Sequence, residues 1–154
     1  FTDADLSTPI EEAALLLAAI EAGADVAIGS RGLSESAVQV HQPWWREKAG
    51  KLFGLLVRAF VLPGIRDTQC GFKCFRRDAA RAICEHQTQE RWAFDVELLL
   101  IARRLGYRIA EVPVRWVNDP NTKVKMLTDG PQMLLDVLAA RWRHRGLRPR
   151  REAG

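Results

Sequence analysis

The chain has 154 residues, which suits one compact domain or part of a larger one but not two substantial cores. Its composition, 47% apolar and 27% charged, is that of an ordinary globular protein and excludes a collagen, a coiled-coil rod or a long disordered tail. No run of roughly 18 uninterrupted apolar residues occurs, so we expect no segment that spans a bilayer unaided. Three cysteines without metal-site spacing indicate free thiols in a reducing compartment: Cys70, Cys74 and Cys84.

Positive charge is concentrated at the C-terminal end. Residues 141–154 contain six arginines and one glutamate, a net charge of +5, so the other 140 residues sum to −1 within the total of +4. An arginine-rich run of this kind attracts anionic lipid headgroups or phosphate polymers. Because the chain lacks interleaved aromatics and any recognisable reading element, we expect no nucleic-acid partner.

Caps and breakers predict the elements of the first half. A helix is expected over 9–22, with Ser7 or Thr8 as its cap and Gly23 at its end. A short buried strand over 25–30 and a polar loop over 31–43 follow. Pro63-Gly64 then ends an apolar helix over 44–62, whose large side chains are expected either in the core or against a membrane.

The second half continues the alternation of strands and helices. The sequence predicts a strand over 71–75, helices over 78–86 and 94–105, a strand pair over 108–112 and 114–117, and a helix from about 131 to 143. Pro113 places the strand pair at a sheet edge or a bulge. Together the elements favour an α/β layered sheet, with a domain over 1–140 and a basic tail over 141–154.

Two carboxylates near the start, Asp3 and Asp5, follow what resembles a strand end. In an open α/β sheet such residues project into the crevice where ligands bind, and Mg²⁺ often pairs one or two carboxylates with substrate phosphates. A solvated turn is the structural alternative. A phosphatase of the haloacid-dehalogenase type also begins with Asp-X-Asp, but it places Thr or Val where Ser7 stands.

The order of the motifs along the chain is more specific. After Asp3-Ala4-Asp5 come Gly29-Ser30-Arg31, Arg46, Asp67-Thr68-Gln69-Cys70-Gly71-Phe72-Lys73, Trp92-Ala93-Phe94-Asp95-Val96-Glu97, Glu111-Val112-Pro113-Val114 and Asn121-Thr122-Lys123. This series resembles the family 2 glycosyltransferases of the GT-A fold, and most nearly their dolichyl-phosphate glucosyltransferase branch, a neighbour of the dolichyl-phosphate mannose synthases.

The resemblance implies a three-layer α/β/α fold of which this chain is the C-terminal portion. The family's Pro-Ala-Tyr-Asn-Glu-like turn and Asp-Asp-Gly-Ser-like segment form most of the nucleotide pocket, and neither occurs here. The chain also opens with Phe1 rather than Met, and we expect it to be a fragment that is inactive alone. The implied reaction is inverting transfer of a hexose, glucose in this branch, from a nucleotide sugar (UDP-glucose or GDP-mannose) to polyprenyl or dolichyl phosphate.

The resemblance also assigns roles to individual residues. Asp3 and Asp5 would hold Mg²⁺ or Mn²⁺ against the donor diphosphate. Arg31 and Arg46 would bind the acceptor's phosphate, since a guanidinium fork suits phosphate oxygens. The remaining implied site residues are Asp67 and Gln69 in an acceptor-side loop, Thr122 and Lys123 in a loop that closes over phosphates, and Asp95 as the catalytic carboxylate.

Each of these positions also has a structural explanation. Asp67 can cap a turn, and Arg46 can form a surface salt bridge. Asp95 and Glu97 begin a helix, where acidic side chains complement the dipole, and their spacing lets at most one of them face the site.

Three hypotheses remain open from sequence. A phosphate monoester is already anionic near neutral pH, so a polyprenyl-phosphate acceptor needs no base, whereas a soluble or glycan acceptor would need Asp95 as one. A non-catalytic, membrane-binding basic module is the third. The first hypothesis implies a cytoplasmic enzyme, peripheral at the inner membrane face, where the helix over 131–143 and its basic tail would lie among headgroups unless that helix packs on the sheet.

Overall fold

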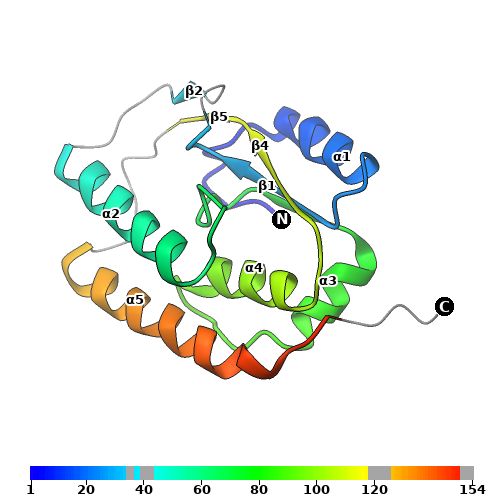
Figure 1. Cartoon of the computed structure of the whole chain (residues 1–154). Helices are drawn as coiled ribbons and strands as arrows, with labels where there is room; N and C mark the ends of the chain where they lie inside the picture. The colour runs from blue at the N-terminus through cyan, green and yellow to red at the C-terminus, as the bar shows by residue number, and fades with distance from the viewer. Residues whose placement is uncertain (34–36, 39–43, 118–125, 150–154) are drawn as a thin grey trace.

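The computed structural model describes residues 1–33, 37–38, 44–117 and 126–149. Helices and strands alternate along these ranges, which confirms the α/β class (Figure 1). In chain order the elements are η1 Ile10–Glu12, α1 Ala13–Glu21, β1 Val26–Ser30, β2 Ala37–Val38, α2 Trp44–Phe60, β3 Lys73–Phe75, α3 Arg77–Cys84, α4 Phe94–Arg104, β4 Ile109–Pro113, β5 Arg115–Trp116, α5 Met126–Arg143 and η2 His144–Gly146.

The central sheet has the order β3-β1-β4. Strand β1 runs parallel to β4 and antiparallel to β3. Residues 1–3 extend the sheet beyond β3 through a bridge between Thr2 and Phe72 and a 2.8 Å bond from the amide of Asp3 to the carbonyl of Gly71. Because residues 1–3 run in the same direction as β1, Asp3 lies at the edge of the sheet where β1 ends at Ser30. This edge is where open α/β sheets bind ligands.

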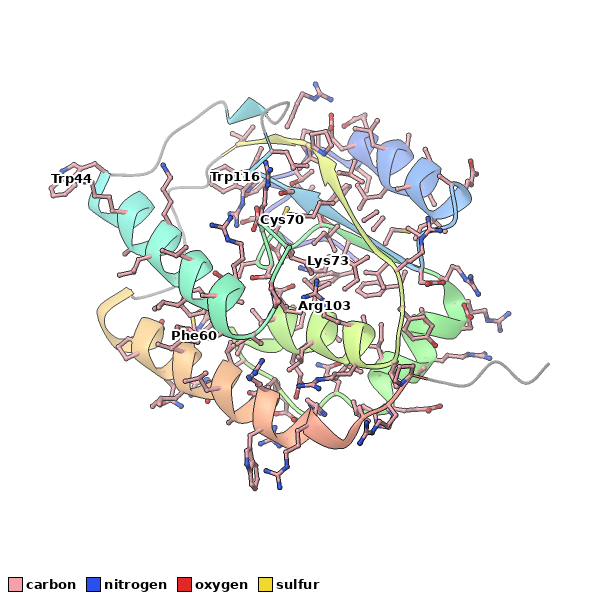
Figure 2. All side chains as sticks on the ribbon, viewed as in Figure 1. Trp44, Phe60, Cys70, Lys73, Arg103 and Trp116 are labelled. Atoms are coloured by element: carbon pink, nitrogen blue, oxygen red, sulfur yellow. The ribbon has the colours of Figure 1, made fainter. Side chains whose placement is uncertain are left out.

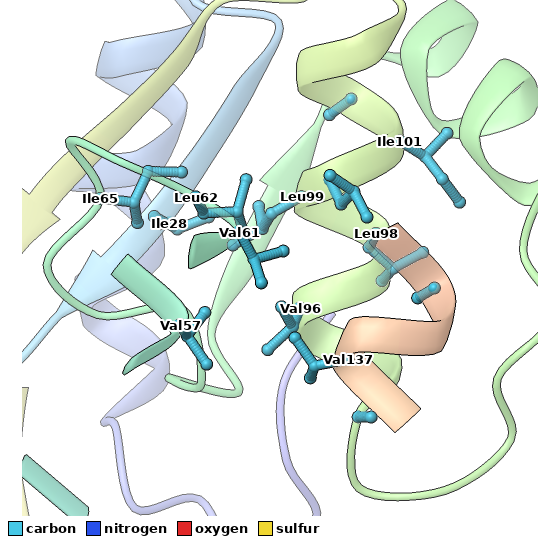
Figure 3. Packing of buried hydrophobic residues seen from close by; sticks show 14 of the residues in the cluster. Ile28, Val57, Val61, Leu62, Ile65, Val96, Leu98, Leu99, Ile101 and Val137 are labelled. Atoms are coloured by element: carbon cyan, nitrogen blue, oxygen red, sulfur yellow. The ribbon is translucent and has the colours of Figure 1, made fainter. Parts of the chain in front are cut away.

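Helices cover both faces of the sheet. All five residues of β1 are buried. On one face Ala27 packs with Leu16 of α1, and on the other Ile28 joins a core shared with α2, α4 and α5 (Figures 1 and 3). That second core contains Val57, Leu62, Val96, Leu99 and Val137, and burial of each such side chain contributes about 1.5–3 kcal/mol. The layered arrangement agrees with part of a glycosyltransferase domain.

Two local predictions in the body of the fold were wrong. Neither Ser7 nor Thr8 caps the first helix with its side chain, since Thr8 is buried and hydrogen bonds to Cys70 instead. The two strands around Pro113 do not pair with each other, because β4 pairs with β1 and β5 pairs with β2. Pro113 does end an edge strand, as expected.

The last helix also begins earlier than predicted. It starts at Met126 and contains Pro131, at about which the helix was predicted to begin. Beyond Arg143 the chain still packs on the fold, since His144 is buried and Leu147 contacts the core. No helix among the described residues is long and apolar enough to cross a bilayer.

Candidate active site

Arg31 and Asp67 form the best-defined pair at the carboxyl edge of the sheet. Arg31 directly follows β1, and its Nε and Nη2 atoms donate to the two carboxylate oxygens of Asp67 at 2.7 and 2.9 Å. The backbone amide of Arg31 donates to the same carboxylate at 2.9 Å. The guanidinium also lies 5.2 Å from the ring centroid of Trp116 in β5. The side chain of Arg31 remains 31% exposed, so this oriented cation is accessible from solvent.

Charge pairing outweighs burial at both members of this pair. Burial alone would raise the pKa of Asp67, but the charge and hydrogen bonds of Arg31 lower that pKa below its ordinary value. Burial alone would lower the pKa of Arg31, and Asp67 raises it instead. Both groups are therefore charged at neutral pH, and the loop that carries Asp67 is tied to the end of β1.

A second, more deeply buried pair joins Lys73 to Asp95. Lys73 begins β3, and its side chain has no exposed surface. Its Nζ atom donates to Asp95 Oδ1 and to the carbonyl of Cys70, each at 2.5 Å. Burial raises the pKa of Asp95, Lys73 opposes this, and the negative charges of Asp3 and Asp67 add to the rise. Asp95 therefore belongs to the same electrostatic cluster as the residues at the end of β1.

Asp3 completes this cluster from the N-terminal segment. Burial and the charge of Asp5 raise the pKa of Asp3, while Lys73 and Arg31 act in the opposite direction. The carboxylate of Asp3 lies against the backbone of Gly71, where an added Cβ would stand 1.8 Å from Oδ2. Gly71 thus leaves room for the carboxylate at this position.

Asp3 and Asp5 suit a hard divalent cation. Both residues keep solvent-exposed surface, although the carboxylate of Asp3 packs on Gly71, and one oxygen of Asp5 accepts the amide of Ser7 at 3.0 Å. Among the described residues no group of three His, Cys, Asp or Glu side chains forms a metal site. A cation held by these two carboxylates would need further oxygen ligands from outside the described residues, and Mg²⁺ commonly binds through only one or two carboxylates.

The other predicted residues are placed less completely. Gln69 is half-buried, and its backbone amide donates to Asp67 Oδ1 at 3.2 Å. Arg46 lies in the first turn of α2, but its side chain is outside the described residues, as are Thr122 and Lys123. Glu97 points away from the cluster, because its carboxylate accepts bonds from Thr88 and Gln89 and lies 2.7 Å from His144.

Sequence reasoning missed the roles of Lys73, Glu111 and Trp116. Figure 2 shows Trp116, Cys70 and Lys73 along the middle of the molecule, beside the sheet edge. Glu111 of β4 accepts the hydroxyl of Ser30 and the amide of Asp67 at 2.9 and 3.0 Å. The available signal was a charged residue inside an otherwise apolar strand, at Lys73 and at Glu111.

Comparison of the sequence with known proteins shows the family of the chain. No family model matches the chain. The chain is 40% identical over 119 residues to the dolichyl-phosphate beta-glucosyltransferase of Homo sapiens, covering 77% of this chain and 37% of that protein. The corresponding protein of Dictyostelium discoideum is 42% identical over 92 residues, or 60% of this chain and 28% of that protein. Glycosyltransferase AglD of Haloferax volcanii is 34% identical over 143 residues, or 92% of this chain and 23% of that protein.

The chain belongs to the dolichyl-phosphate glucosyltransferase branch of the family 2 glycosyltransferases. The resemblance stated from sequence motifs is thereby confirmed. The chain spans only about a third of the length of curated relatives such as the two from Trichomonas vaginalis, of which it covers 34% and 36%. The cluster of Asp3, Arg31, Asp67, Lys73 and Asp95 is the candidate active site of this glycosyltransferase portion.

Proposed function

We propose that the protein containing this chain transfers glucose, with inversion, from a nucleotide sugar to dolichyl or another polyprenyl phosphate. The observation that carries the proposal is the joint placement of Asp3 and Arg31 at one sheet edge, where the amide of Asp3 bonds to Gly71 and Arg31 directly follows β1. An acidic group suited to a cation and an oriented arginine are what two phosphate-bearing substrates require. The relatives named as dolichyl-phosphate beta-glucosyltransferases support the transfer of glucose to dolichyl phosphate.

The pairing of Asp95 favours a phosphate acceptor over a hydroxyl acceptor. A sugar hydroxyl has to lose its proton to a positioned base, whereas a phosphate monoester with a second pKa near about 6 is already an anionic nucleophile. Asp95 is 8% exposed, and Lys73 engages one of its oxygens. Because this oxygen is already bonded to an ammonium, we assign Asp95 the role of fixing Lys73 rather than that of a base. The chain's own contribution is then to hold the acceptor in line for attack on the opposite face of the sugar.

Arg31 would bind the acceptor's phosphate together with Arg46, and Gln69 would line the same loop. Asp3 and Asp5 would hold Mg²⁺ or Mn²⁺. The cation would neutralise the negative charge that develops on the departing nucleotide diphosphate. Asp95 would keep the ammonium of Lys73 fixed beside Asp3. Thr122 and Lys123 would close over the phosphates.

The transfer reaction is the test of this proposal. With the full-length polypeptide, a nucleotide glucose and a short polyprenyl phosphate, we expect metal-dependent formation of a lipid-linked glucose of inverted configuration. In Asp3→Asn the Mg²⁺ concentration for half-maximal transfer should rise about tenfold or more, because one anionic ligand is lost. Asp78→Asn is the control, since Asp78 is an exposed partner of Arg76. Transfer that does not depend on the acceptor's phosphate group would contradict the proposal.

We also propose that the enzyme is cytoplasmic and works at the inner membrane surface, where its lipid acceptor lies. Helices α2 and α5 lie side by side and expose large apolar residues outward (Figures 1 and 2). These are Trp44, Leu52, Leu55 and Phe60 on α2 and Leu135, Leu138 and Trp142 on α5. The residues on α5 share one helix face. Three arginines flank Trp142 at the end of this face: Arg141, Arg143 and Arg145. Apolar residues on one face with arginines at its border are the pattern of an interfacial helix. The free thiol of exposed Cys84 supports a reducing compartment.

Vesicle binding tests the membrane face. The double variant Leu135→Ser with Trp142→Ser removes two side chains that are 61% and 68% exposed, so folding should change little. We expect at least about a hundredfold weaker binding to vesicles that contain phosphatidylserine, since each of the two apolar side chains contributes about 1.5–3 kcal/mol when it is withdrawn from water. Leu17→Ser, a 53% exposed position on α1 across the sheet, is the matched control. Equal binding of the two variants would exclude α5 as the docking element.

A further inference from the structure

Glu111 connects three segments behind the pair of Arg31 and Asp67. It lies on β4 and is partly buried. Its Oε1 atom accepts the hydroxyl of Ser30 at 2.9 Å and the amide of Asp67 at 3.0 Å. Its Oε2 atom accepts the amide of Arg66 at 2.9 Å. One carboxylate therefore receives donors from the end of β1 and from two successive amides of the loop before β3.

These contacts fix the direction in which Asp67 points. Two consecutive backbone amides directed at one carboxylate determine the local path of the loop, and bonds to a charged acceptor are stronger than neutral ones. The side chain of Asp67 then extends from this fixed backbone to the amide, Nε and Nη2 of Arg31. A shift of the loop would move Asp67 and with it the plane of the guanidinium.

We propose that Glu111 is a positioning residue, which orients Arg31 for the acceptor's phosphate by holding the 66–67 loop that carries Asp67. The inference rests on the proposed transfer to a polyprenyl phosphate. A phosphate is recognised by the direction of the guanidinium fork as well as by its charge. Misorientation of the fork by a fraction of an ångström therefore weakens the phosphate contact while the positive charge remains.

The test compares Glu111→Gln with wild type in the full-length protein. The amide has the shape of the carboxylate, but it offers one accepting oxygen and an NH₂ group that faces an N–H donor. We expect kcat/KM for the polyprenyl phosphate to fall about tenfold, mainly through KM, because charge-assisted hydrogen bonds are lost. The KM of the nucleotide sugar should stay within about twofold. Hydrogen exchange in a peptide covering 64–70 should become faster, while β1 should be unchanged.

Val112→Ala is the matched control on the same strand. The side chain of Val112 packs with the core on the α1 face, so its truncation weakens the fold without touching the loop. An equal rise in the KM for the polyprenyl phosphate in Val112→Ala would overturn the proposal. It would show that Glu111 acts only through the general stability of the fold. Unchanged acceptor kinetics in Glu111→Gln would also overturn it. If wild type does not use a polyprenyl phosphate, the proposed function fails, and unaltered exchange over 64–70 would then separately refute the loop-holding role.

Discussion

Replacing Lys73 by Met is expected to lower the free energy of unfolding by about 3–5 kcal/mol, the largest stability effect of any single substitution at this site. Methionine keeps the unbranched stem but removes the ammonium, which leaves the buried carboxylate of Asp95 and the carbonyl of Cys70 without this donor. Lys73 also lies 5.7 Å from the ring centroid of Phe1, a contact that methionine retains only as an apolar one. Urea unfolding at neutral pH measures the change.

The pH dependence of the Lys73→Met variant gives a second measurement. Burial already raises the pKa of Asp95, and loss of Lys73 removes the main opposing charge, so the pKa of Asp95 should rise further. An acid whose pKa is raised in the folded state binds its proton more tightly there than in the unfolded state. The difference in free energy of unfolding between wild type and Lys73→Met should therefore shrink as pH falls from 7 towards about 4, the pKa of Asp95 in the unfolded chain.

Arg76→Met provides the surface comparison for Lys73→Met. Arg76 pairs with Asp25 and Asp78, but its side chain is 48% exposed, so water screens both pairs and the free energy of unfolding should fall far less than in Lys73→Met. A double variant with Lys73→Met and Asp95→Leu should recover part of the lost stability, since no buried charge is left unpaired. Equal decreases in the free energy of unfolding in Lys73→Met and Arg76→Met would show that the buried pair stabilises the fold no more than an exposed pair does.

Local signals in the sequence were sufficient for most of the fold. Pro63-Gly64 and Gly106 mark the ends of α2 and α4 within about three residues, because proline lacks an amide donor and glycine readily adopts a positive φ. The same reasoning failed at α5. The helix was predicted to begin at about Pro131, but it begins at Met126, five residues earlier, where no local start signal stands.

The candidate site could be predicted only in its parts. The motifs identified Asp3, Arg31, Asp67 and Asp95, but nothing local pairs Arg31 with a residue 36 positions away. That pairing follows from the antiparallel register of β1 and β3, which brings the loop before β3 to the end of β1. Lys73 and Glu111 were part of the quoted motifs and received no role, since a charged residue in a short strand is as compatible with an exposed face as with a buried partner.

Arg31→Lys is expected to lower kcat/KM for the acceptor about a hundredfold, and Arg31→Ala about a thousandfold. Lysine keeps the positive charge but cannot reproduce the planar fork that engages both oxygens of Asp67 while it lies over Trp116. The acceptor's phosphate would then meet a flexible point charge in place of an oriented one. The measurement is the initial rate of transfer against acceptor concentration at saturating donor.

Arg115→Lys is the matched control for Arg31→Lys. Arg115 precedes Trp116, its side chain is 52% exposed and it pairs with Glu12, so transfer should stay within about twofold of wild type. Because Arg31 lowers the pKa of Asp67, that carboxylate stays ionised at pH values above its unfolded pKa, and its contribution is lost only as pH falls below about 4. The factor by which Arg31→Lys lowers kcat/KM for the acceptor should therefore be constant from pH 6 to 8. A deficit no larger than that of Arg115→Lys would remove Arg31 from the acceptor site and leave its pairing with Asp67 as a structural contact alone.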